Sequence, residues 1–291
     1  MYRCKNCDFA FTAPLPPAEE FEVFYEEDYT DSEDWRTCNR LSVNEYWSHL
    51  RPFFPDKPFR FLEVGGAFGH FSAKVKSDTE ASVVMLECGK SAANHARDEL
   101  GLEVVQSFYE NYHPVKKFDI IFSAHVIEHV RDVRAYFEHS AKMLNPGGSI
   151  ILITPNGGAW KFRFFGASWC WASTEHLHFL SPKSARLLAG QTGFTDCISR
   201  ALRPSHWRYP GFLIGFVSRW KNLWKYRAIT QPDQPVTAAP AASDKTRSKV
   251  GRVFYWLNRW AGVEQRILTP VDAVLGSDEL LVCATLPTAG L

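Results

Sequence analysis

The residue pair whose side chains could most readily take part in a reaction is Glu128–His129, within the stretch FDIIFSAHVIEHV. A histidine titrates close to neutral pH, so His129 is predicted to act as a base toward a bound molecule, with Glu128 orienting its ring. The alternative is that the pair only caps the following helix or supports its loop. Because the pair follows a short apolar run, it is expected just beyond the end of a buried strand.

Two further histidines, His176 and His178, lie in the stretch STEHLHFLS. A spacing of two places both side chains on one side of an extended segment. These two histidines could instead converge on a divalent metal together with His125, Glu128 and His129. None of the spacings matches a recognised ligand motif, so no metal is predicted.

A turn containing several glycines stands in FLEVGGAFGHF, where a short apolar strand ends. The dinucleotide pattern G-x-G-x-x-G fails when it is started at Gly65, because Ala67 and His70 occupy the later glycine positions. A phosphate-binding loop of the type G-x-x-x-x-G-K-[ST] is absent as well. The turn does match [DE]-x-G-x-G-x-G from Glu63 to Gly69, except at Ala67.

The elements that would position these residues alternate between β-rich and helical runs, which is the pattern of βαβ units and a parallel sheet. The predicted strands are 60–64, 82–87, 104–108, 118–124, 149–155, 195–202 and 279–287. The predicted helices are 68–77, 90–100, 130–144 and one that is capped by Ser181, has Pro182 at its first position and ends at Gly193. Residues 156–180 are predicted to form an irregular aromatic loop.

Further motifs follow the glycine turn in a fixed order. SVVMLE ends in Glu87, 22 residues after Gly65, and it is followed by FDIIFSA and then by MLNPGGSIILITPN. Together these motifs resemble the class I S-adenosylmethionine (SAM)-dependent methyltransferases over about residues 20–200 and the final strand. The resemblance implies an α/β fold with a Rossmann-like seven-stranded sheet whose last strand is antiparallel. It also implies SAM as methyl donor and S-adenosylhomocysteine as product.

The resemblance also assigns residues to the donor, position by position. Around the methionine part of SAM it places Glu63, Gly65, Gly66, Ala67 and Gly69. It places Glu87 on the ribose with Cys88 beside it, Ser107 and Phe108 nearest the adenine, and Ser123, Ala124 and His125 near the sulfonium.

On the acceptor side, the predicted catalytic residues are His129, Glu128, His176 and His178. The resemblance implies methyl transfer to a small-molecule or lipid-linked acceptor, most often at an oxygen of a sugar, a quinone or a natural-product intermediate. Transfer to nitrogen or carbon, and a catalytically silent SAM-binding scaffold, stay open as alternatives. Nucleic acid is disfavoured because the formal net charge is only +1, and because SAHV stands where base-modifying enzymes carry [DNS]-P-P-[YFW].

The seven cysteines are odd in number and scattered, which favours reduced thiols and a cytoplasmic protein. No signal peptide and no apolar run of membrane-spanning length is recognised, although contact with a membrane surface stays open. Cys4 and Cys7 resemble the second half of a zinc ribbon that precedes many methyltransferases of this group. The first cysteine pair is missing, so zinc binding is not expected.

The predicted domain division has four parts: an N-terminal ribbon remnant and cap (1–45), a SAM-binding core (46–204), a helical insertion (205–276) and the final strand of the core (277–291). The insertion contains a Pro- and Ala-rich flexible linker at 231–248. Amphipathic aromatic and basic patterns at 207–227 and 250–262 favour a lid over the acceptor, a homodimer contact or contact with an anionic membrane surface.

Overall fold

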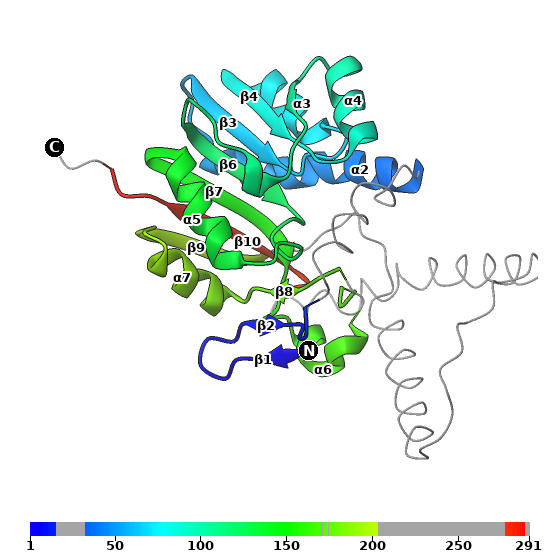
Figure 1. The fold of residues 1–291 in the computed structure, drawn as a ribbon, viewed down its shortest axis with the longest axis vertical. Helices are drawn as coiled ribbons and strands as arrows, with labels where there is room; N and C mark the ends of the chain where they lie inside the picture. The colour runs from blue at the N-terminus through cyan, green and yellow to red at the C-terminus, as the bar shows by residue number, and fades with distance from the viewer. Residues whose placement is uncertain (16–32, 170, 174, 203–276, 289–291) are drawn as a thin grey trace, which may run out of the picture.

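The computed structural model describes residues 1–15, 33–169, 171–173, 175–202 and 277–288. A seven-stranded sheet forms its centre, in the order β5-β4-β3-β6-β7-β10-β9 (Figure 1). The strands are β3 (Phe59–Val64), β4 (Ala81–Leu86), β5 (Glu103–Val105), β6 (Phe118–Ala124), β7 (Leu144–Pro155), β9 (Asp196–Leu202) and β10 (Glu279–Thr285). Strand β10 runs antiparallel to both β7 and β9, whereas β3, β4, β5, β6 and β7 pair in parallel. The predicted sheet with its antiparallel last strand is confirmed.

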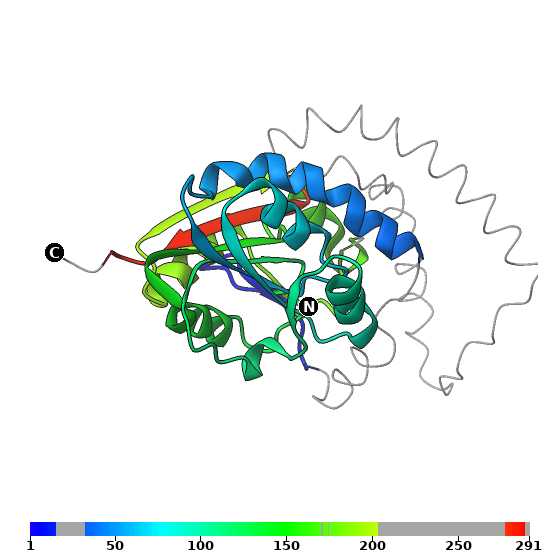
Figure 2. The same ribbon diagram turned by 90° about the horizontal axis from the view of Figure 1, so that it is seen from above.

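Helices cover both faces of the sheet (Figure 2). They are α2 (Glu33–Leu50), α3 (His70–Asp78), α4 (Lys90–Asp98), α5 (Val133–Met143), α6 (Trp160–Phe165) and α7 (Pro182–Gln191), with short 3-10 turns η2 (Arg51–Phe53), η3 (Tyr109–Asn111) and η4 (Gly166–Ser168). Apolar side chains of α2 and α3 pack on one face of the sheet. Those of α5 and α7 pack on the other. Burial of both faces explains why the central strands are almost continuously apolar.

The helix that follows the aromatic stretch begins as its sequence predicts. Ser181 accepts a hydrogen bond from the Ser184 N–H, the Ser184 side chain bonds back to Ser181, and Pro182 occupies the first position of α7. Gly193 lies just beyond the end of α7 with φ 91°, a left-handed conformation that glycine adopts at little cost.

Two regions differ from expectation. The predicted strand 104–108 is shorter, because β5 ends at Val105 and Phe108 already caps η3. The predicted irregular loop 156–180 contains α6, η4 and β8 (His178–Phe179). Its aromatic residues form a small core of their own, and β8 joins β1 (Tyr2–Arg3) and β2 (Ala10–Phe11) in a three-stranded antiparallel sheet. Long-range burial of aromatic rings therefore orders a stretch that has no helical or strand period.

The N-terminal cysteines lie in the turn between β1 and β2. The Cys4 N–H donates to the Phe9 carbonyl, and the Asp8 N–H donates to the Cys4 carbonyl. Helix α2 continues across the predicted boundary between residues 45 and 46. The predictions for 205–276, including those for 207–227, 231–248 and 250–262, concern residues within 203–276, which lie outside the described residues.

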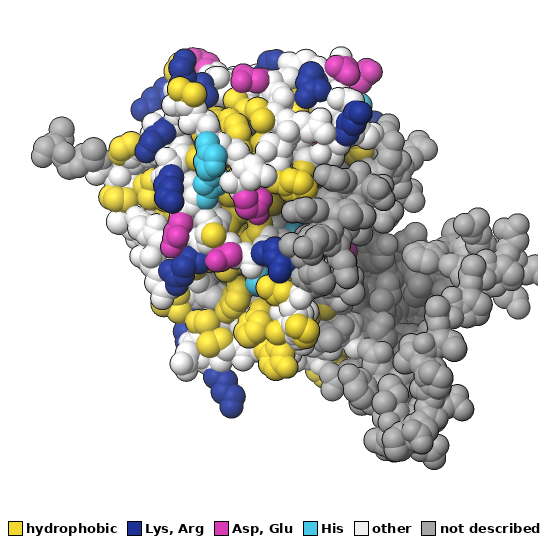
Figure 3. Space-filling view, in the orientation of Figure 1, with side chains coloured by type: hydrophobic (Ala, Val, Ile, Leu, Met, Phe, Trp, Pro, Cys, Tyr) yellow, Lys and Arg dark blue, Asp and Glu magenta, His cyan; other side chains and the backbone are white. Residues whose placement is uncertain are grey.

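None of the described helices is both long and apolar enough to cross a membrane. On the face shown in Figure 3, the described side chains include both signs of charge together with histidines and apolar residues. This mixture agrees with the formal net charge of +1.

Candidate active site

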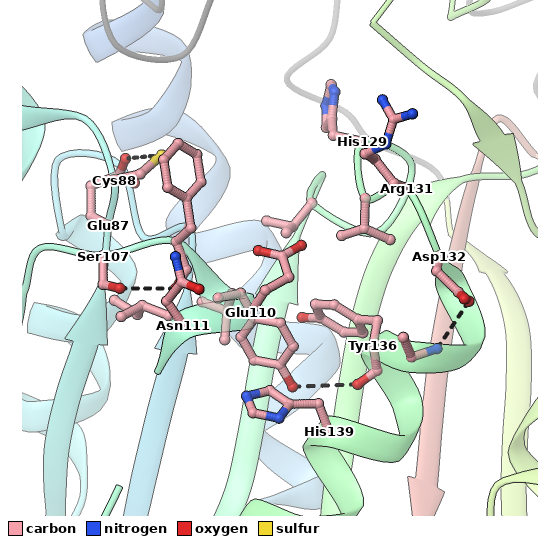
Figure 4. Close-up of a pocket in the computed structure, with 18 of the residues that line it drawn as sticks. Glu87, Cys88, Ser107, Glu110, Asn111, His129, Arg131, Asp132, Tyr136 and His139 are labelled. Atoms are coloured by element: carbon pink, nitrogen blue, oxygen red, sulfur yellow. Dashed lines mark hydrogen bonds between the residues drawn. The ribbon is translucent and has the colours of Figure 1, made fainter. Parts of the chain in front are cut away.

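A cavity of about 610 Å³ opens at the carboxyl ends of β3, β4 and β6. Glu87 and Cys88 stand on one side of it and His129 and Arg131 on the other, with Glu110 and Tyr136 between them (Figure 4). This is the edge at which open α/β sheets bind ligands. Seven of the predicted site residues line the cavity: Gly65, Glu87, Cys88, Ser107, Phe108, His125 and His129.

The glycine turn has the tight geometry that its sequence requires. Gly65 has φ 66°, and a Cβ at this position would lie 2.6 Å from the Val126 side chain. Ala67, the departure from the glycine pattern, also has a positive φ of 47°. Its N–H donates to Glu87 at 2.8 Å, which offsets the strain of a left-handed alanine.

Glu87 holds the turn in place from the end of β4. One carboxylate oxygen accepts from the Ala67 N–H and the other from the Gly89 N–H, each at 2.8 Å. Burial raises the pKa of Glu87, and these two N–H donors oppose that rise. Oε2 keeps a second lone pair that a ribose hydroxyl could use, and a ribose hydroxyl at Oε1 would replace the weak hydrogen bond that Oε1 accepts from the Cys88 thiol at 3.7 Å. Beside it, burial raises the pKa of the Cys88 thiol to about 12, so the thiol stays protonated at neutral pH.

Glu63 lies beneath the turn. Its carboxyl group is buried and accepts a hydrogen bond from Ser72. Burial raises the pKa of Glu63 to about 8, despite that hydrogen bond. A Cβ on Gly66 would come within 3.2 Å of the Glu63 carboxyl carbon, so this acid is packed directly against the turn. Its predicted contact with the methionine part of SAM stays a prediction.

The side of the cavity that is predicted to hold the adenine is formed by the segment after β5. The Ser107 hydroxyl donates to the Phe108 carbonyl at 3.0 Å, and both residues line the cavity. Glu110 and Asn111 of η3 line it as well (Figure 4). Sequence reasoning missed these two residues because the stretch between the third and fourth strands shows no period.

His129 lies across the cavity from Glu87. Its Nδ1 donates to the Glu175 carbonyl at 3.1 Å, which leaves Nε2 as the acceptor nitrogen. Burial lowers the pKa of His129 to about 4, so the ring is neutral at physiological pH. The ring of His176 lies edge-on to it, with centroids 4.6 Å apart. His176 donates from Nδ1 to the Trp171 carbonyl at 2.6 Å, and burial lowers its pKa too.

Glu128 is fully buried behind these histidines. Its carboxylate accepts from Thr154 Oγ1 at 2.9 Å and from His125 Nδ1 at 3.1 Å. Burial is the largest single influence on Glu128 and raises its pKa, but the hydrogen bond from His125 and the electrostatic effect of the neighbouring histidines together lower the pKa to about 2. Ligand atoms of Glu128, His129 and His176 lie within 4.8 Å of one another, a spacing that would also suit a divalent cation.

His125 connects Glu128 to a second carboxylate. Its Nε2 donates to Glu279 Oε1 at 3.1 Å, and Trp171 stacks on its ring at 5.1 Å with an interplanar angle of 7°. Burial by itself lowers the pKa of His125, yet the bonds to Glu128 and Glu279 raise it to about 10. Both ring nitrogens of His125 therefore lie within hydrogen-bond distance of a buried Glu side chain, an arrangement that favours the protonated ring. Sequence reasoning missed Glu279, because a strand residue far along the chain gives no local signal.

The remaining predicted residues occupy neighbouring positions. Ser123 is buried in β6, where it accepts a hydrogen bond from the Tyr136 hydroxyl at 3.0 Å. Ala124 ends the same strand, and Gly69 precedes α3 with φ 78°. His178 stacks on Phe9 and donates from Nε2 to a backbone carbonyl of residue 131. In the described contacts it is therefore His176, rather than His178, that touches His129.

Comparison with known proteins places the chain in a family. Residues 40–198 match the family model described as a methyltransferase domain. The chain is 32% identical over 103 residues to malonyl-[acyl-carrier protein] O-methyltransferase 1 of Ilyobacter polytropus, which covers 34% of this chain and 38% of that protein. It is 37% identical over 129 residues to a ubiquinone biosynthesis O-methyltransferase of Paramagnetospirillum magneticum, which covers 42% of this chain and 50% of that protein. The chain spans only about two fifths of the length of the first curated relatives it matches.

Solved structures show the same fold at low identity. A SAM-dependent methyltransferase of Thermotoga maritima superposes with a TM-score of 0.55 at 15% identity, over 91% of this chain and 99% of that chain. Phosphoethanolamine N-methyltransferase 2 of Haemonchus contortus, solved with SAM, gives a TM-score of 0.57 at 16% identity, over 92% of this chain and 60% of that chain. With more than half of its residues matching the family model, the chain belongs to the methyltransferase domain family.

Proposed function

We propose that this protein transfers a methyl group from SAM to an oxygen atom of a small-molecule or lipid-linked acceptor. The observation that carries the proposal is that one cavity joins the glycine turn and Glu87 at the donor side to His129 at the other side. Donor and acceptor would therefore meet within a single cavity. The names of the curated relatives, which are O-methyltransferases, support oxygen as the acceptor atom.

At the donor side, Glu87 offers two carboxylate oxygens to the ribose hydroxyls. Ser107, Phe108 and Cys88 border the space beyond it, where the adenine would lie. The N-terminal end of α3 follows the glycine turn directly, so its N–H groups face the region in which the methionine carboxylate would bind.

Methyl transfer from a sulfonium is an in-line displacement with a good leaving group, so the protein gains most by alignment and by removal of the acceptor proton. His129 would remove that proton through Nε2. A pKa of about 4 makes His129 a weak base toward a free hydroxyl. His129 is a sufficient base late in the reaction, because the proton on an acceptor oxygen that is gaining a methyl group becomes strongly acidic. The buried Glu128 and His176 would keep the ring in place.

Transfer to nitrogen would use the same alignment, and a silent scaffold would bind SAM without turnover. A transfer assay with isotopically labelled SAM and a panel of phenols, carboxylic acids, sugars, quinols and amines tests the proposal. Label in an oxygen-linked product is the expected result. Labelled amines alone would move the assignment to nitrogen, and SAM binding without transfer to any acceptor class would support the scaffold.

A further inference from the structure

Glu279 is a buried acidic residue at a position where packing alone does not require one. It is the first residue of β10, its side chain is completely buried, and Leu281 and Cys283 follow at alternate positions on the same strand face. Those two residues pack into the apolar core beneath α2. An apolar residue at position 279 would continue that core, whereas a buried acidic side chain loses its hydration. An acidic residue at such a position therefore points to a purpose other than packing.

The contacts of Glu279 lead to the acceptor side of the cavity. Its Oε1 accepts from the Tyr46 hydroxyl at 3.0 Å and from His125 Nε2 at 3.1 Å, across 154 residues of sequence. Its Oε2 is buried and has no hydrogen-bond partner among the described residues. Glu279 does not itself line the cavity, so it would act through His125.

His125 is held unusually firmly for a loop residue. It has a left-handed φ of 55°, and its N–H donates to the Ile153 carbonyl at 2.8 Å. Its Nδ1 bonds to Glu128, its Nε2 bonds to Glu279, and Trp171 covers its ring. Each ring nitrogen faces a buried Glu side chain, and Nε2 also lies 3.1 Å from the Tyr46 hydroxyl. Carboxylates on both sides of one ring favour the form that carries both protons.

The same contacts extend to the predicted catalytic histidines. The Glu128 backbone carbonyl accepts the N–H groups of Leu177 and His178, at 2.7 and 3.2 Å. The loop that carries His176 is thereby tied to Glu128, and Trp171 accepts from His176 through its carbonyl. A change in the orientation of His125 would therefore reach Glu128, Trp171 and His176 together.

We propose that Glu279 is a positioning residue for methyl transfer. Together with Tyr46 it holds His125 against Glu128, and it thereby fixes the side of the cavity that carries His125 and His129. The inference rests on the proposed function and deepens it. Glu279 touches neither donor nor acceptor, so its loss should alter turnover and leave SAM binding intact.

The test uses Glu279→Gln, which keeps the size of the side chain and an oxygen that can accept from Tyr46. Turnover should fall roughly 10- to 100-fold, the range that corresponds to loss of one charge-assisted hydrogen bond. The Kd for SAM, measured by calorimetry, should stay as in the wild type. Cys283→Ala is the matched control, because it alters a buried residue on the same strand face and should leave turnover unchanged.

A second readout separates positioning from mere structural support. Nitrogen-15 spectra of the His125 side chain should show both ring nitrogens protonated at pH 7.5 in the wild type, and only one protonated in Glu279→Gln. Unchanged turnover in Glu279→Gln overturns the proposal, and so does a singly protonated His125 in the wild type. A parallel loss of SAM affinity would also overturn it. If the wild type transfers no methyl group at all, the proposed function fails, and the His125 spectra still decide whether Glu279 holds this ring.

Discussion

A pair of buried glutamates stands behind each half of the cavity, and the two pairs have different partners. Behind the donor half, the partners that Glu63 and Glu87 have among the described residues are a serine hydroxyl, a thiol and backbone N–H groups. Behind the acceptor half, Glu128 and Glu279 both contact the ring of His125. Burial raises the pKa of both Glu63 and Glu87, because their hydrogen bonds compensate it only in part. At Glu128 the hydrogen bond from His125 and the nearby histidines together outweigh burial, and the pKa falls to about 2.

This difference in the partners of the buried glutamates indicates the charge of the molecule that each half would bind. SAM brings its own positive charge as a sulfonium, so the donor half needs no cation of its own. The acceptor half contains its positive charge already, in His125. It therefore suits a neutral acceptor, such as an alcohol or a phenol, better than a cationic one.

The largest effect is expected from Glu87→Ala in the donor half. The variant removes both predicted ribose contacts and also the partners of the Ala67 and Gly89 N–H groups. Two hydrogen bonds to a charged group correspond to a loss of roughly 10³-fold in SAM affinity. Calorimetric titration with SAM and with S-adenosylhomocysteine measures it. Wild-type affinity in the variant would exclude Glu87 from the donor site.

His129→Ala, in the acceptor half, should lower turnover roughly 10²-fold with SAM binding preserved. The pH profile sharpens this prediction. Because the pKa of His129 is lowered from 6.5 to about 4, the base stays unprotonated down to that pH. The acid limb of kcat/KM should therefore lie near pH 4 rather than 6.5. An acid limb at 6.5, or full turnover in the variant, would remove His129 from the mechanism.

Glu63→Gln addresses stability rather than turnover. The Glu63 pKa is raised from 4.5 to about 8, so the folded protein binds a proton here that the unfolded chain has released. This contribution to stability is fully present below pH 4.5 and is lost as the pH rises through about 8. Between pH 4.5 and about 8, the free energy of unfolding decreases by about 1.4 kcal/mol for each unit by which the pH rises.

Glutamine mimics the protonated acid, so the Tm of Glu63→Gln should exceed that of the wild type by an amount that grows as the pH rises towards about 8 and then levels off. Thermal unfolding followed by circular dichroism at each pH measures this difference. Ser77→Ala, an exposed site on the same helix as Ser72, serves as control. Parallel Tm curves for wild type and Glu63→Gln would show that Glu63 is ionised in the folded protein.

More of the residues predicted for the donor half than of those predicted for the acceptor half line the cavity, and the reason is physical. The glycine turn, Glu87 and the strands that carry them depend on residues close together in sequence and on the periods of buried strands. The network of the acceptor half joins Tyr46 of α2, His125 after β6 and Glu279 of β10, which only the sheet order brings together. A hydrogen-bonded network across such separations has no period and no motif. Similarly, α6 and the three-stranded sheet are ordered by aromatic burial rather than by local pattern.

The smallest effect is expected from removal of metal ions. Glu128, His129 and His176 are close enough to coordinate a divalent cation, but Glu128 already bonds to the imidazolium of His125. A dication at Glu128 would lie close to that positive charge, and repulsion at this range in a buried site is severe. Dialysis against EDTA should therefore leave turnover unchanged. If turnover is lost and then restored by Mg²⁺ or Mn²⁺, the neutral imidazoles of His129 and His176 are metal ligands rather than a base and its support. The contrast between the two halves would then rest on a metal ion instead of on His125.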